Sequence, residues 1–465
     1  MEAMTIMAIF RKKRPQKSQQ LSLNQQPAAT PISNTSHINQ CQEYLDMLMS
    51  SDGRHSSGVA LKIYIENFKR LNEIFGYGYC EGLLSQILNY LRKTTGKRVH
   101  HFIGMEYIIV LDHTTTSHAK SICQEILERF EHVWTVGDID CICSIQIGIC
   151  SFPTYAATSD HLLNCLDMAI SKAAEYGSNQ MAVYNNLLHQ QASRRRNIAL
   201  YLNEALDRQE IEVRYRPTYN IEKQKFVRAE LYLRIFVKGL GFIGAPEFTP
   251  IAEDSGQIRT LEYFALEHLG TCIASMLEKN IEFESVSTQI SSLMLQQEDF
   301  LSKIEIILRR YKIPAGKLAL EFSGNTYATS LTKISEVLHT LSEMGVEIIL
   351  NDFGSGLFSI TNLLQYPVDT VKLERMFICQ LENNPQARIM VDSLVHMASN
   401  LGLKVIAEGV ESHHQIKILN RADCLYQQGF YYSPTLEKHH LLQLMDSSLE
   451  DAKIILDKAK EDVRT

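Results

Sequence analysis

The stretch Glu347-Ile-Ile-Leu-Asn351-Asp352-Phe-Gly354-Ser-Gly356 decides how the second half of the chain is interpreted. A largely apolar run leads into an Asn-Asp pair, and a Phe-Gly-Ser-Gly sequence follows. A short apolar run bounded by turn residues is typical of a buried parallel strand. The pattern predicts a strand whose polar pair lies at its C-terminal end, on a loop loosened by glycines. In a (β/α)8 barrel, chemistry is built at that end of the strands.

The chain around this stretch alternates between strand-like and helix-like segments. Most of the predicted strands are separated by amphipathic helical segments, and about eight of them in some 230 residues predict a TIM-like (β/α)8 barrel. The first two strands have no helix between them, so we expect the strand order to depart from the standard barrel. The predicted strands are 211–218, 226–235, 284–290, 317–323, 346–351, 369–374, 404–409 and 425–431.

The first half of the chain has a mixed pattern without this regular rhythm. Strands are predicted at 59–65 and 141–150, helices at 79–91 and 161–175, and a hairpin at 100–111. The fold class is therefore α/β throughout, with a compact first domain and a barrel. The predicted organisation is a disordered tail at 1–40, an α/β domain at 41–188, a linker helix at 189–200, the barrel at 201–446 and a C-terminal helix at 447–465.

Composition excludes several classes of protein. The 465 residues are 45% hydrophobic and 21% charged, which is ordinary for a globular domain. The net charge of −7 gives no global attraction to nucleic acid, so DNA is not an expected partner. No apolar run reaches about 18 residues, so no membrane span is expected and a cytoplasmic location is favoured. The ten cysteines form no CxxC pair, which favours reduced core cysteines over disulfides or a metal site.

Polar side chains end most of the predicted strands of the barrel. Crowded carboxylates raise each other's pKa, and divalent cations relieve that cost. Oxygen ligands suit Mg²⁺ or Mn²⁺, and two such ions about 3.5–4 Å apart would serve phosphodiester hydrolysis. One such residue alone is more often a solvated strand end, but the whole set at one rim favours a site. The set comprises Glu230, Gln289, Glu321, Asn351, Asp352, Lys372, Glu374, Glu408, Glu411 and Gln428.

Ordered motifs over about 201–440 resemble one known family. They resemble the family signatures GxEALLR, LEIT, DDFGTG, VKIDR, AEGVE and QGY, and residues 241–258 resemble its G…P..F.P.AE..G.I segment. The chain is therefore similar to the EAL family, the phosphodiesterases of the bacterial second messenger cyclic di-GMP. The matching stretches are Arg228–Arg234, Leu320–Phe322, Asn351–Gly356, Val371–Arg375, Ala407–Glu411 and Gln428–Phe430.

The resemblance implies roles for individual residues. It implies cyclic di-GMP as the ligand, Mg²⁺ or Mn²⁺ as the cofactor and a homodimer formed through the barrel. Metal ligands are implied at Glu230, Gln289, Glu321, Asn351, Asp352 and Glu374. Catalytic roles are implied for Lys372, Glu408 and Glu411, and contact with the substrate for Arg234 and Gln428.

The first domain resembles the GGDEF family, the diguanylate cyclases, in a degenerate form. The segment from Ile103 to Tyr107 falls where the GGDEF motif is expected, and Phe68–Gly76 resembles FKxxNDxxG. The first glycine is replaced by Ile103 and the aspartate by Met105. A β-branched side chain and a thioether replace neither a close backbone approach nor a hard oxygen ligand. Cyclase activity is therefore not expected.

The barrel also departs from the family pattern. Gln289 replaces an asparagine, Asn351 and Glu374 replace aspartates, and Gly324 replaces a supporting glutamate. Mg²⁺ demands near-ideal octahedral geometry, so these changes should impair hydrolysis. Three readings stay open: a poorly catalytic or non-catalytic cyclic di-GMP receptor with a protein partner, an active phosphodiesterase that yields pGpG, or a protein- or RNA-binding scaffold without nucleotide.

Overall fold

The computed structural model describes residues 34–49, 57–205, 208, 210–323, 331–354, 363–447 and 455–456. The chain divides into two compact units, a first unit of residues 1–189 and a second unit of residues 190–465. Helix α1 begins at Asn34, so the predicted tail of 1–40 is wrong over its last seven residues. Cys41 and Leu45 anchor this helix, with 1% and 0% of their surfaces exposed.

Three earlier predictions fall on residues that the structure leaves undescribed. The rest of the predicted tail, the change at Gly324 and most of the C-terminal helix at 447–465 lie outside the described residues. Within that last segment, residues 447, 455 and 456 are described, and of these 455 and 456 are helical.

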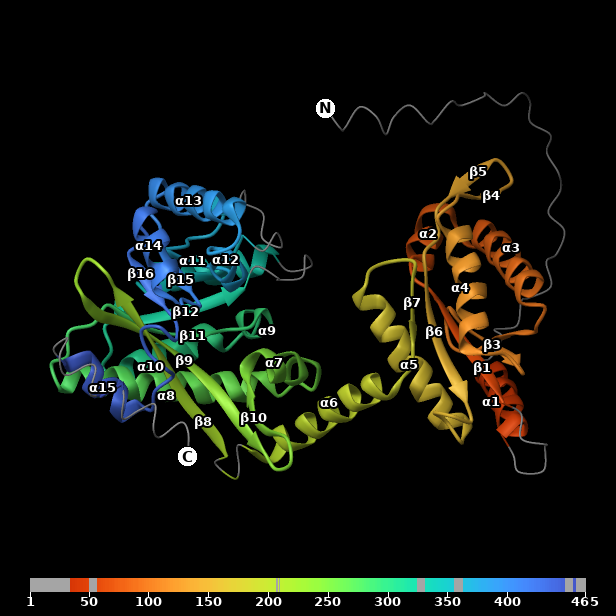
Figure 1. The fold of residues 1–465 in the computed structure, drawn as a ribbon, viewed down its shortest axis with the longest axis horizontal. Coiled ribbons are helices and arrows are strands. Elements are labelled where there is room, and N and C mark those ends of the chain that lie inside the picture. Colours follow the sequence, from red (N-terminus) through yellow and green to blue (C-terminus); the bar gives the residue numbers. More distant parts are fainter. Residues whose placement is uncertain are drawn as a thin grey trace. The chain divides into compact units, whose positions relative to one another are not determined.

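The first unit is built on a five-stranded sheet with helices on both faces (Figure 1). Its strand order is β2 (Val99–His101), β3 (Glu106–Asp112), β1 (Gly58–Ile65), β6 (Ile145–Phe152) and β7 (Gln180–Val183). Central strand β1 is antiparallel to both of its neighbours, β3 and β6. A separate two-stranded hairpin joins β4 (Trp134–Val136) to β5 (Ile139–Cys141).

Successive side chains of β1 point to opposite faces of the sheet, which explains why this unit has two hydrophobic cores. Leu61 and Ile63 belong to a core with α2 (Phe68–Phe75), α3 (Tyr77–Thr95) and α4 (Thr116–Phe130). Ala60 lies in the opposite core with α1 (Asn34–Met49) and α5 (Ser159–Glu175). The predicted strand at 141–150 is misplaced, because Cys141 ends β5 and β6 begins only at Ile145.

The second unit follows helix α6 (Asn186–Ala205) and forms a closed eight-stranded barrel (Figure 1). All eight predicted strands are present, and the expected departure from standard topology is confirmed. The first strand is antiparallel to both neighbours, whereas the other seven are parallel. The barrel strands are β8 (Ile211–Asn220), β9 (Lys225–Val237), β11 (Ser285–Gln289), β12 (Leu318–Ser323), β13 (Glu347–Phe353), β14 (Thr370–Leu373), β15 (Lys404–Glu408) and β16 (Tyr426–Gln428).

The barrel interior is polar, and its apolar core lies between strands and helices. On β13, Ile348 and Leu350 are fully buried in that core, while Glu347, Ile349 and Asn351 alternate with them. A short strand, β10 (Gly241–Gly244), adds to β9 outside the barrel. The helical elements are α7 (Ala245–Asp254), α8 (Ile258–Glu278), α9 (Ser292–Leu295), α10 (Phe300–Arg310), the 3₁₀ turn η2 (Ala315–Lys317), α11 (Leu331–Glu343), α12 (Arg375–Gln380), α13 (Pro385–Asn400), α14 (His413–Arg421) and α15 (Lys438–Asp446).

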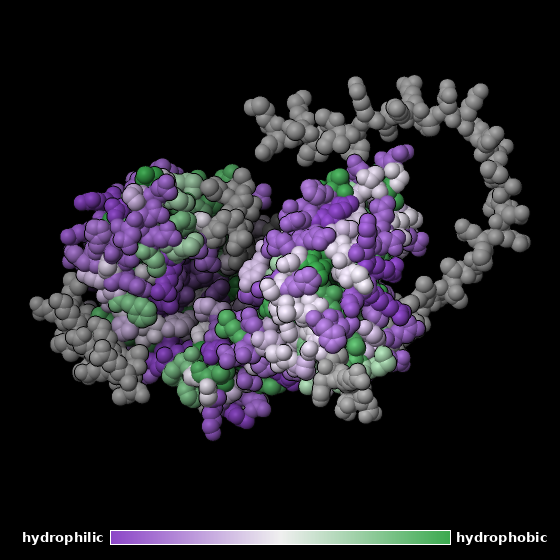
Figure 2. All heavy atoms as spheres, turned by 45° about the vertical axis from the view of Figure 1, so that its right-hand side comes forward, coloured by the Kyte–Doolittle hydropathy of each residue, from purple (hydrophilic) through white to green (hydrophobic). Residues whose placement is uncertain are grey.

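The described surface is mainly hydrophilic on the face seen in Figure 2, with small hydrophobic patches. Within the described ranges, we find no helix that has both the length and the apolar character needed to cross a bilayer. Nine of the ten cysteines are buried, and only Cys379 is exposed.

Candidate functional site

Side chains that point into the barrel from neighbouring strands lie at the same level along the barrel axis. Glu230 on β9 lies in register with Ser287 on β11, and Glu408 on β15 lies in register with Gln428 on β16. Lys372 lies on β14, whose partner is β15. Because parallel strands end at the same rim, these residues come together although up to about 200 positions separate them in the chain.

Lys372 is the centre of this cluster. Its ammonium nitrogen lies 2.9 Å from Glu230 Oε2, 3.0 Å from Glu321 Oε2 and 3.6 Å from Glu408 Oε2. The side chains of Lys372 and Glu321 are only 2% and 1% exposed. A buried lysine without acidic partners would lose its proton. The carboxylates therefore stabilise the charged form of Lys372, and Lys372 stabilises theirs.

The two buried glutamates differ in how strongly they hold a proton. Burial raises the pKa of Glu230, but the nearby Lys372 and Arg216 outweigh that effect and lower the pKa below its usual range. Burial and the charge of Glu230 raise the pKa of Glu321. Burial opposes the charge of Lys372, yet the three carboxylates raise its pKa. The site therefore combines a firmly ionised carboxylate with one that accepts a proton more readily.

Arg216 and Ser287 complete the cluster, although the sequence analysis did not single them out. Arg216 on β8 donates to Glu408 Oε1 at 2.7 Å and lies 3.7 Å from Glu230 Oε2. Ser287 donates to Glu321 Oε1. The sequence signal for both was available in strand alternation: Ser287 precedes Gln289 by two residues and therefore shares its face of β11.

A small cavity at the mouth joins the cluster to the loops above it. Glu408 and Glu411 both line it, and Glu411 accepts from Arg375 at 2.7 Å. The cavity volume is about 30 Å³. Gly429 lines it too, with a backbone so close to the neighbouring strand loop that an added Cβ would lie 2.2 Å from Val410 O. Only glycine fits there.

The ends of β13 and β14 carry polar atoms that lack partners within the described chain. These atoms are Asn351 Oδ1 and Glu374 Oε2, both buried. Asp352 has a φ of 54° and accepts from Ser323 Oγ at 3.3 Å. Asn351 lies near the C-terminal end of β13, as predicted; Asp352 also lies in β13, which runs on to Phe353 through an irregularity in register, so its predicted place on the following loop is wrong.

The predicted metal ligands are not all brought together. Gln289 is in backbone register with Glu321, but its side chain is exposed. No group of three or more His, Cys, Asp or Glu side chains within the described ranges is arranged to hold a metal ion. The two orphaned oxygens of Asn351 and Glu374 would suit a cation, but Lys372 already neutralises Glu230 and Glu321. Lys372 therefore lies between Glu230 and Glu321, while the buried oxygens of Asn351 and Glu374 could still serve a cation.

Glu262 on α8 supports the loop that follows Gln289. It accepts from Ser291 N at 2.7 Å and from Ser291 Oγ at 3.1 Å. Ser291 is the N-cap of α9 and accepts from Met294 N at 3.2 Å. Burial raises the pKa of Glu262 to about 8, against an ordinary value of 4.5.

A second charged layer lies below the rim. Arg228 is 3% exposed and donates to Glu284 Oε2 at 2.9 Å and to Glu347 Oε1 at 2.7 Å. It precedes Glu230 by two residues on β9 and therefore shares its face, where the family signature has a glycine. The layer ties the base of β9 to the start of β13 across the barrel.

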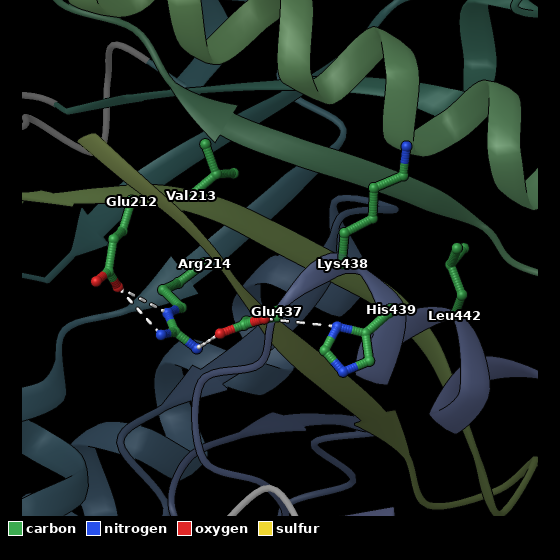
Figure 3. Close-up of a pocket in the computed structure, with 7 residues that line it drawn as sticks. All are labelled: Glu212, Val213, Arg214, Glu437, Lys438, His439 and Leu442. Carbon is green, nitrogen blue, oxygen red and sulfur yellow. Dashed lines mark hydrogen bonds and ion pairs between the residues drawn. The ribbon is translucent and has the colours of Figure 1, made fainter. Parts of the chain in front are cut away.

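Arg234, the predicted substrate contact, lies apart from the cluster. It donates to Glu212 Oε2 at 2.7 Å, and Arg214 donates to the same oxygen at 3.1 Å. Arg214 also lies 3.2 Å from Glu437 Oε1, and the other oxygen of Glu437, Oε2, lies 3.5 Å from His439 Nδ1 (Figure 3). These residues border a cavity of about 620 Å³ between the edge of β8 and α15 (Figure 3). The cavity is lined by Glu212, Val213, Arg214, Glu437, Lys438, His439 and Leu442.

In the first unit, the segment Ile103–Tyr107, which falls where the GGDEF motif is expected, contains an acidic residue that pairs with a buried lysine. Lys62 on β1 is 2% exposed, lies 2.8 Å from Glu106 Oε2 and also pairs with Asp167 on α5. Its ammonium lies 5.1 Å from the centroid of the Phe102 ring. A protein cation therefore neutralises the one acidic residue of the hairpin Ile103–Tyr107.

Comparison with known proteins identifies the fold. The model of the EAL domain matches residues 200–435, slightly more than half of the chain. The chain belongs to the EAL family. The diguanylate cyclase, GGDEF domain model matches residues 29–180, so the two domains occur in tandem. We refer to the second unit as the EAL unit and to the first as the GGDEF unit.

Curated relatives share this tandem at low identity. The signaling protein YkoW of Bacillus subtilis is 26% identical over 383 residues, which are 82% of this chain and 48% of the relative. The cyclic di-GMP phosphodiesterase PdeR of Escherichia coli is 25% identical over 398 residues, which are 85% of this chain and 60% of the relative. The chain thus spans about half the length of the curated relatives it matches.

Two solved structures resemble the fold. The PaMucR phosphodiesterase in complex with c-di-GMP has a TM-score of 0.50 and 26% identity, covering 52% of this chain and 99% of that chain. The GGDEF–EAL structure of LapD from Vibrio cholerae, bound to c-di-GMP, has a TM-score of 0.54 and 17% identity. It covers 85% of this chain and 93% of that chain, and at this identity it shows the fold alone.

Proposed function

We propose that the EAL unit is a cyclic di-GMP receptor that hydrolyses its ligand poorly or not at all, and that the GGDEF unit is a regulatory domain without cyclase activity. The observation that carries the proposal is the altered set of implied metal ligands, in which Gln289 is exposed and Asn351 replaces a carboxylate by a neutral amide. Lys372 lies against two of the remaining carboxylates, 2.9 Å from Glu230 and 3.0 Å from Glu321.

Charge balance supports this reading. Lys372 and Arg216 contribute two positive charges against the three carboxylates of Glu230, Glu321 and Glu408. The raised pKa of Glu321 brings the cluster still closer to neutrality. A pocket that is nearly neutral by itself attracts divalent cations less than one with a carboxylate excess.

The changes among the implied metal ligands also favour a receptor that hydrolyses its ligand poorly. Gln289 is one methylene longer than asparagine, and its side chain is exposed. Asn351 offers a neutral carbonyl in place of a carboxylate. Cyclic dinucleotide binding can still use the arginines and the polar rim, because guanidinium groups bind phosphates without a metal. If a metal were held, its binding would depend on Glu374 and Asp352.

A receptor that does not turn its ligand over must pass its bound state to another molecule. We therefore include a protein partner in the proposal, together with a homodimer formed through the barrel. Light scattering on the full chain with and without cyclic di-GMP tests the homodimer, and its failure would leave the receptor proposal intact.

An active, metal-dependent phosphodiesterase that yields pGpG is the second candidate. It is favoured by the curated relative PdeR, a cyclic di-GMP phosphodiesterase that is 25% identical to this chain. Glu230, Glu321, Asp352, Lys372 and Glu408 all stand at their motif positions. A scaffold without nucleotide is the third.

Calorimetric titration of cyclic di-GMP into the full chain separates the three. One titration contains Mn²⁺ and a second contains chelator, and the recovered ligand is separated by chromatography. We expect similar affinity in both titrations and intact ligand. Recovery of pGpG at a rate abolished by Glu230→Ala would overturn the proposal in favour of the enzyme, and absence of binding would favour the scaffold.

A matched pair of variants sharpens the test. The double variant Gln289→Asn/Asn351→Asp restores two metal ligands and should gain phosphodiesterase activity by at least about tenfold. Asn280→Asp makes the same chemical change on the exposed turn before β11, at the opposite end of the strand, and should gain nothing. Equal activity in the wild type and the double variant would show that the natural site is already competent.

A further inference from the structure

A small cavity lies inside the barrel, between the Lys372 cluster and the charged layer of Arg228. Glu230, Glu321 and Lys372 line it on the side of the rim, and Arg228 and Ser285 line it on the side of the barrel floor. Its volume is about 10 Å³, close to the smallest space, about 10–15 Å³, in which a protein holds one water molecule.

Two buried polar atoms of the residues around this cavity have no hydrogen-bond partner in the described part of the chain. They are Arg228 Nη2, which is a donor, and Gln428 Oε1, which is an acceptor. The two residues are only 3% and 1% exposed. Because a buried polar group without a partner is costly, this pair favours a bound molecule that accepts from Arg228 and donates to Gln428.

The guanidinium of Arg228 reaches across the barrel floor to the strand that carries Gln428. Its central carbon lies 4.9 Å from the centroid of the Tyr426 ring. Tyr426 precedes Gln428 by two residues on β16 and shares its face. Two residues along a strand span about 6–7 Å. Two hydrogen bonds in series through one water oxygen span up to about 6 Å, so one water fits this separation.

The hydrogen bonds of the Gln428 amide fix which of its atoms faces the cavity. Its Nε2 donates to Arg216 O at 3.1 Å, and the amide also donates to Glu230. The reversed orientation would place the amide oxygen against two other acceptors. Oε1 is therefore the atom that needs a donor, and the donor without a partner beside this cavity is Arg228 Nη2.

Size and charge restrict what the cavity can hold. A nucleotide or a phosphate is far too large for a volume of about 10 Å³. Arg228 and Lys372 repel a cation, whereas Glu230 and the oxygen of Gln428 repel an anion. A water molecule is neutral and both accepts and donates. Thr218 lies directly opposite Arg228 on β8 and also lines the cavity, so its hydroxyl offers a third partner.

We propose that one water molecule binds between Arg228 Nη2 and Gln428 Oε1, and that Arg228 thereby acts as a positioning residue for the Gln428 amide. The inference rests on the proposed function, because Gln428 is a ligand contact implied by the family resemblance. It is particular to this chain, since the family signature has a glycine where Arg228 stands. An amide held in one orientation loses less conformational freedom when the ligand binds, so affinity rises.

A crystal structure of the full chain without nucleotide, at a resolution that shows ordered waters, tests the bridge. We expect one water peak within hydrogen-bond distance of both Arg228 Nη2 and Gln428 Oε1. An empty cavity would overturn the inference. So would an anomalous signal in the cavity after a bromide soak, because the bound species would then be an anion. This measurement needs no ligand, so it decides the bridge even if the chain does not bind cyclic di-GMP.

Variants test the effect of the bridge on the ligand. Arg228→Met/Glu347→Gln removes the guanidinium together with a carboxylate that it pairs with, and circular dichroism checks that the chain still folds. In calorimetry we expect the affinity for cyclic di-GMP to fall by about three- to tenfold. Glu347→Gln alone keeps Arg228 Nη2 and should leave the affinity unchanged, which makes it the matched control.

A double-mutant cycle distinguishes positioning from a general loss of structure. In a Gln428→Leu background, Arg228→Met/Glu347→Gln should cause no further loss of affinity, because the amide that Arg228 positions is gone. An equal loss in both backgrounds would show that Arg228 acts on the fold alone, and would overturn the inference. Absence of cyclic di-GMP binding by the wild type would instead count against the receptor proposal, and the crystal structure would still decide the water bridge.

Discussion

Replacing Glu262 by glutamine should change how the stability of the EAL unit depends on pH. Burial raises the pKa of this carboxyl to about 8 in the folded chain, against an ordinary value of 4.5. Between these two values the folded state keeps a proton that the unfolded state has released. The free energy of unfolding must therefore fall as the pH rises from 4.5 to about 8. Below pH 4.5 this contribution to stability is fully retained.

The size of the effect follows from the shift. One pKa unit corresponds to about 1.4 kcal/mol, and integration of the two titration curves gives an upper limit of about 3.5 kcal/mol lost between pH 5 and pH 8. Glutamine is neutral at both values and has the same shape. Relative to the wild type, we expect Glu262→Gln to gain between about 1 and 3.5 kcal/mol as the pH rises from 5 to 8.

Urea unfolding at the two pH values measures this gain. The only tryptophan, Trp134, lies in the GGDEF unit, so its fluorescence follows that unit, while far-ultraviolet circular dichroism also includes the EAL unit. The gain should appear in the dichroism and not in the fluorescence. Glu278→Gln, an exposed carboxylate at the end of the same helix, serves as the matched control. A gain of the same size at both pH values would refute the reasoning.

Three further substitutions test other parts of the structure. Lys62→Met should destabilise the GGDEF unit by about 1–3 kcal/mol, measured by Trp134 fluorescence in urea, because Glu106 loses its buried cation; an unchanged midpoint would contradict it. Arg228→Met should lower the free energy of unfolding of the EAL unit by about 3–5 kcal/mol, measured in urea. Adding Glu347→Gln should recover part of the loss, because it removes the unpaired charge. A double variant less stable than the single one would count against this account. Gly429→Ala should abolish cyclic di-GMP binding in calorimetry, because its Cβ would lie 2.2 Å from a backbone oxygen; retained affinity would show that the loop can move aside.

The barrel could be predicted because most of its strands are apolar runs that end in polar residues. The convergence of Glu230, Glu321 and Lys372 follows from that rule, since parallel strands end at one rim. Arg216 could not be found in this way, because β8 is antiparallel and delivers its side chain to the rim from within the strand. Arg234 was expected at the rim, but β9 outruns the barrel and carries it outward to Glu212.

Local composition misled the prediction at the N-terminus. The polar sequence around Asn34 suggested a tail, yet this segment begins helix α1. What holds the helix is the burial of Cys41 and Leu45 against the sheet, a tertiary effect that composition does not reveal. The exposure of Gln289 is of the same kind, because register fixes the position of its backbone and not the direction of its long side chain.

The reversed direction of β8 has a consequence for where the chain enters the barrel. In a barrel whose strands are all parallel, the chain enters at the floor, far from the mouth. Here α6 ends at Ala205 and β8 begins at Ile211, at the rim where the other strands end. The chain therefore enters the barrel at the rim that carries the candidate site, through the strand that holds Arg216.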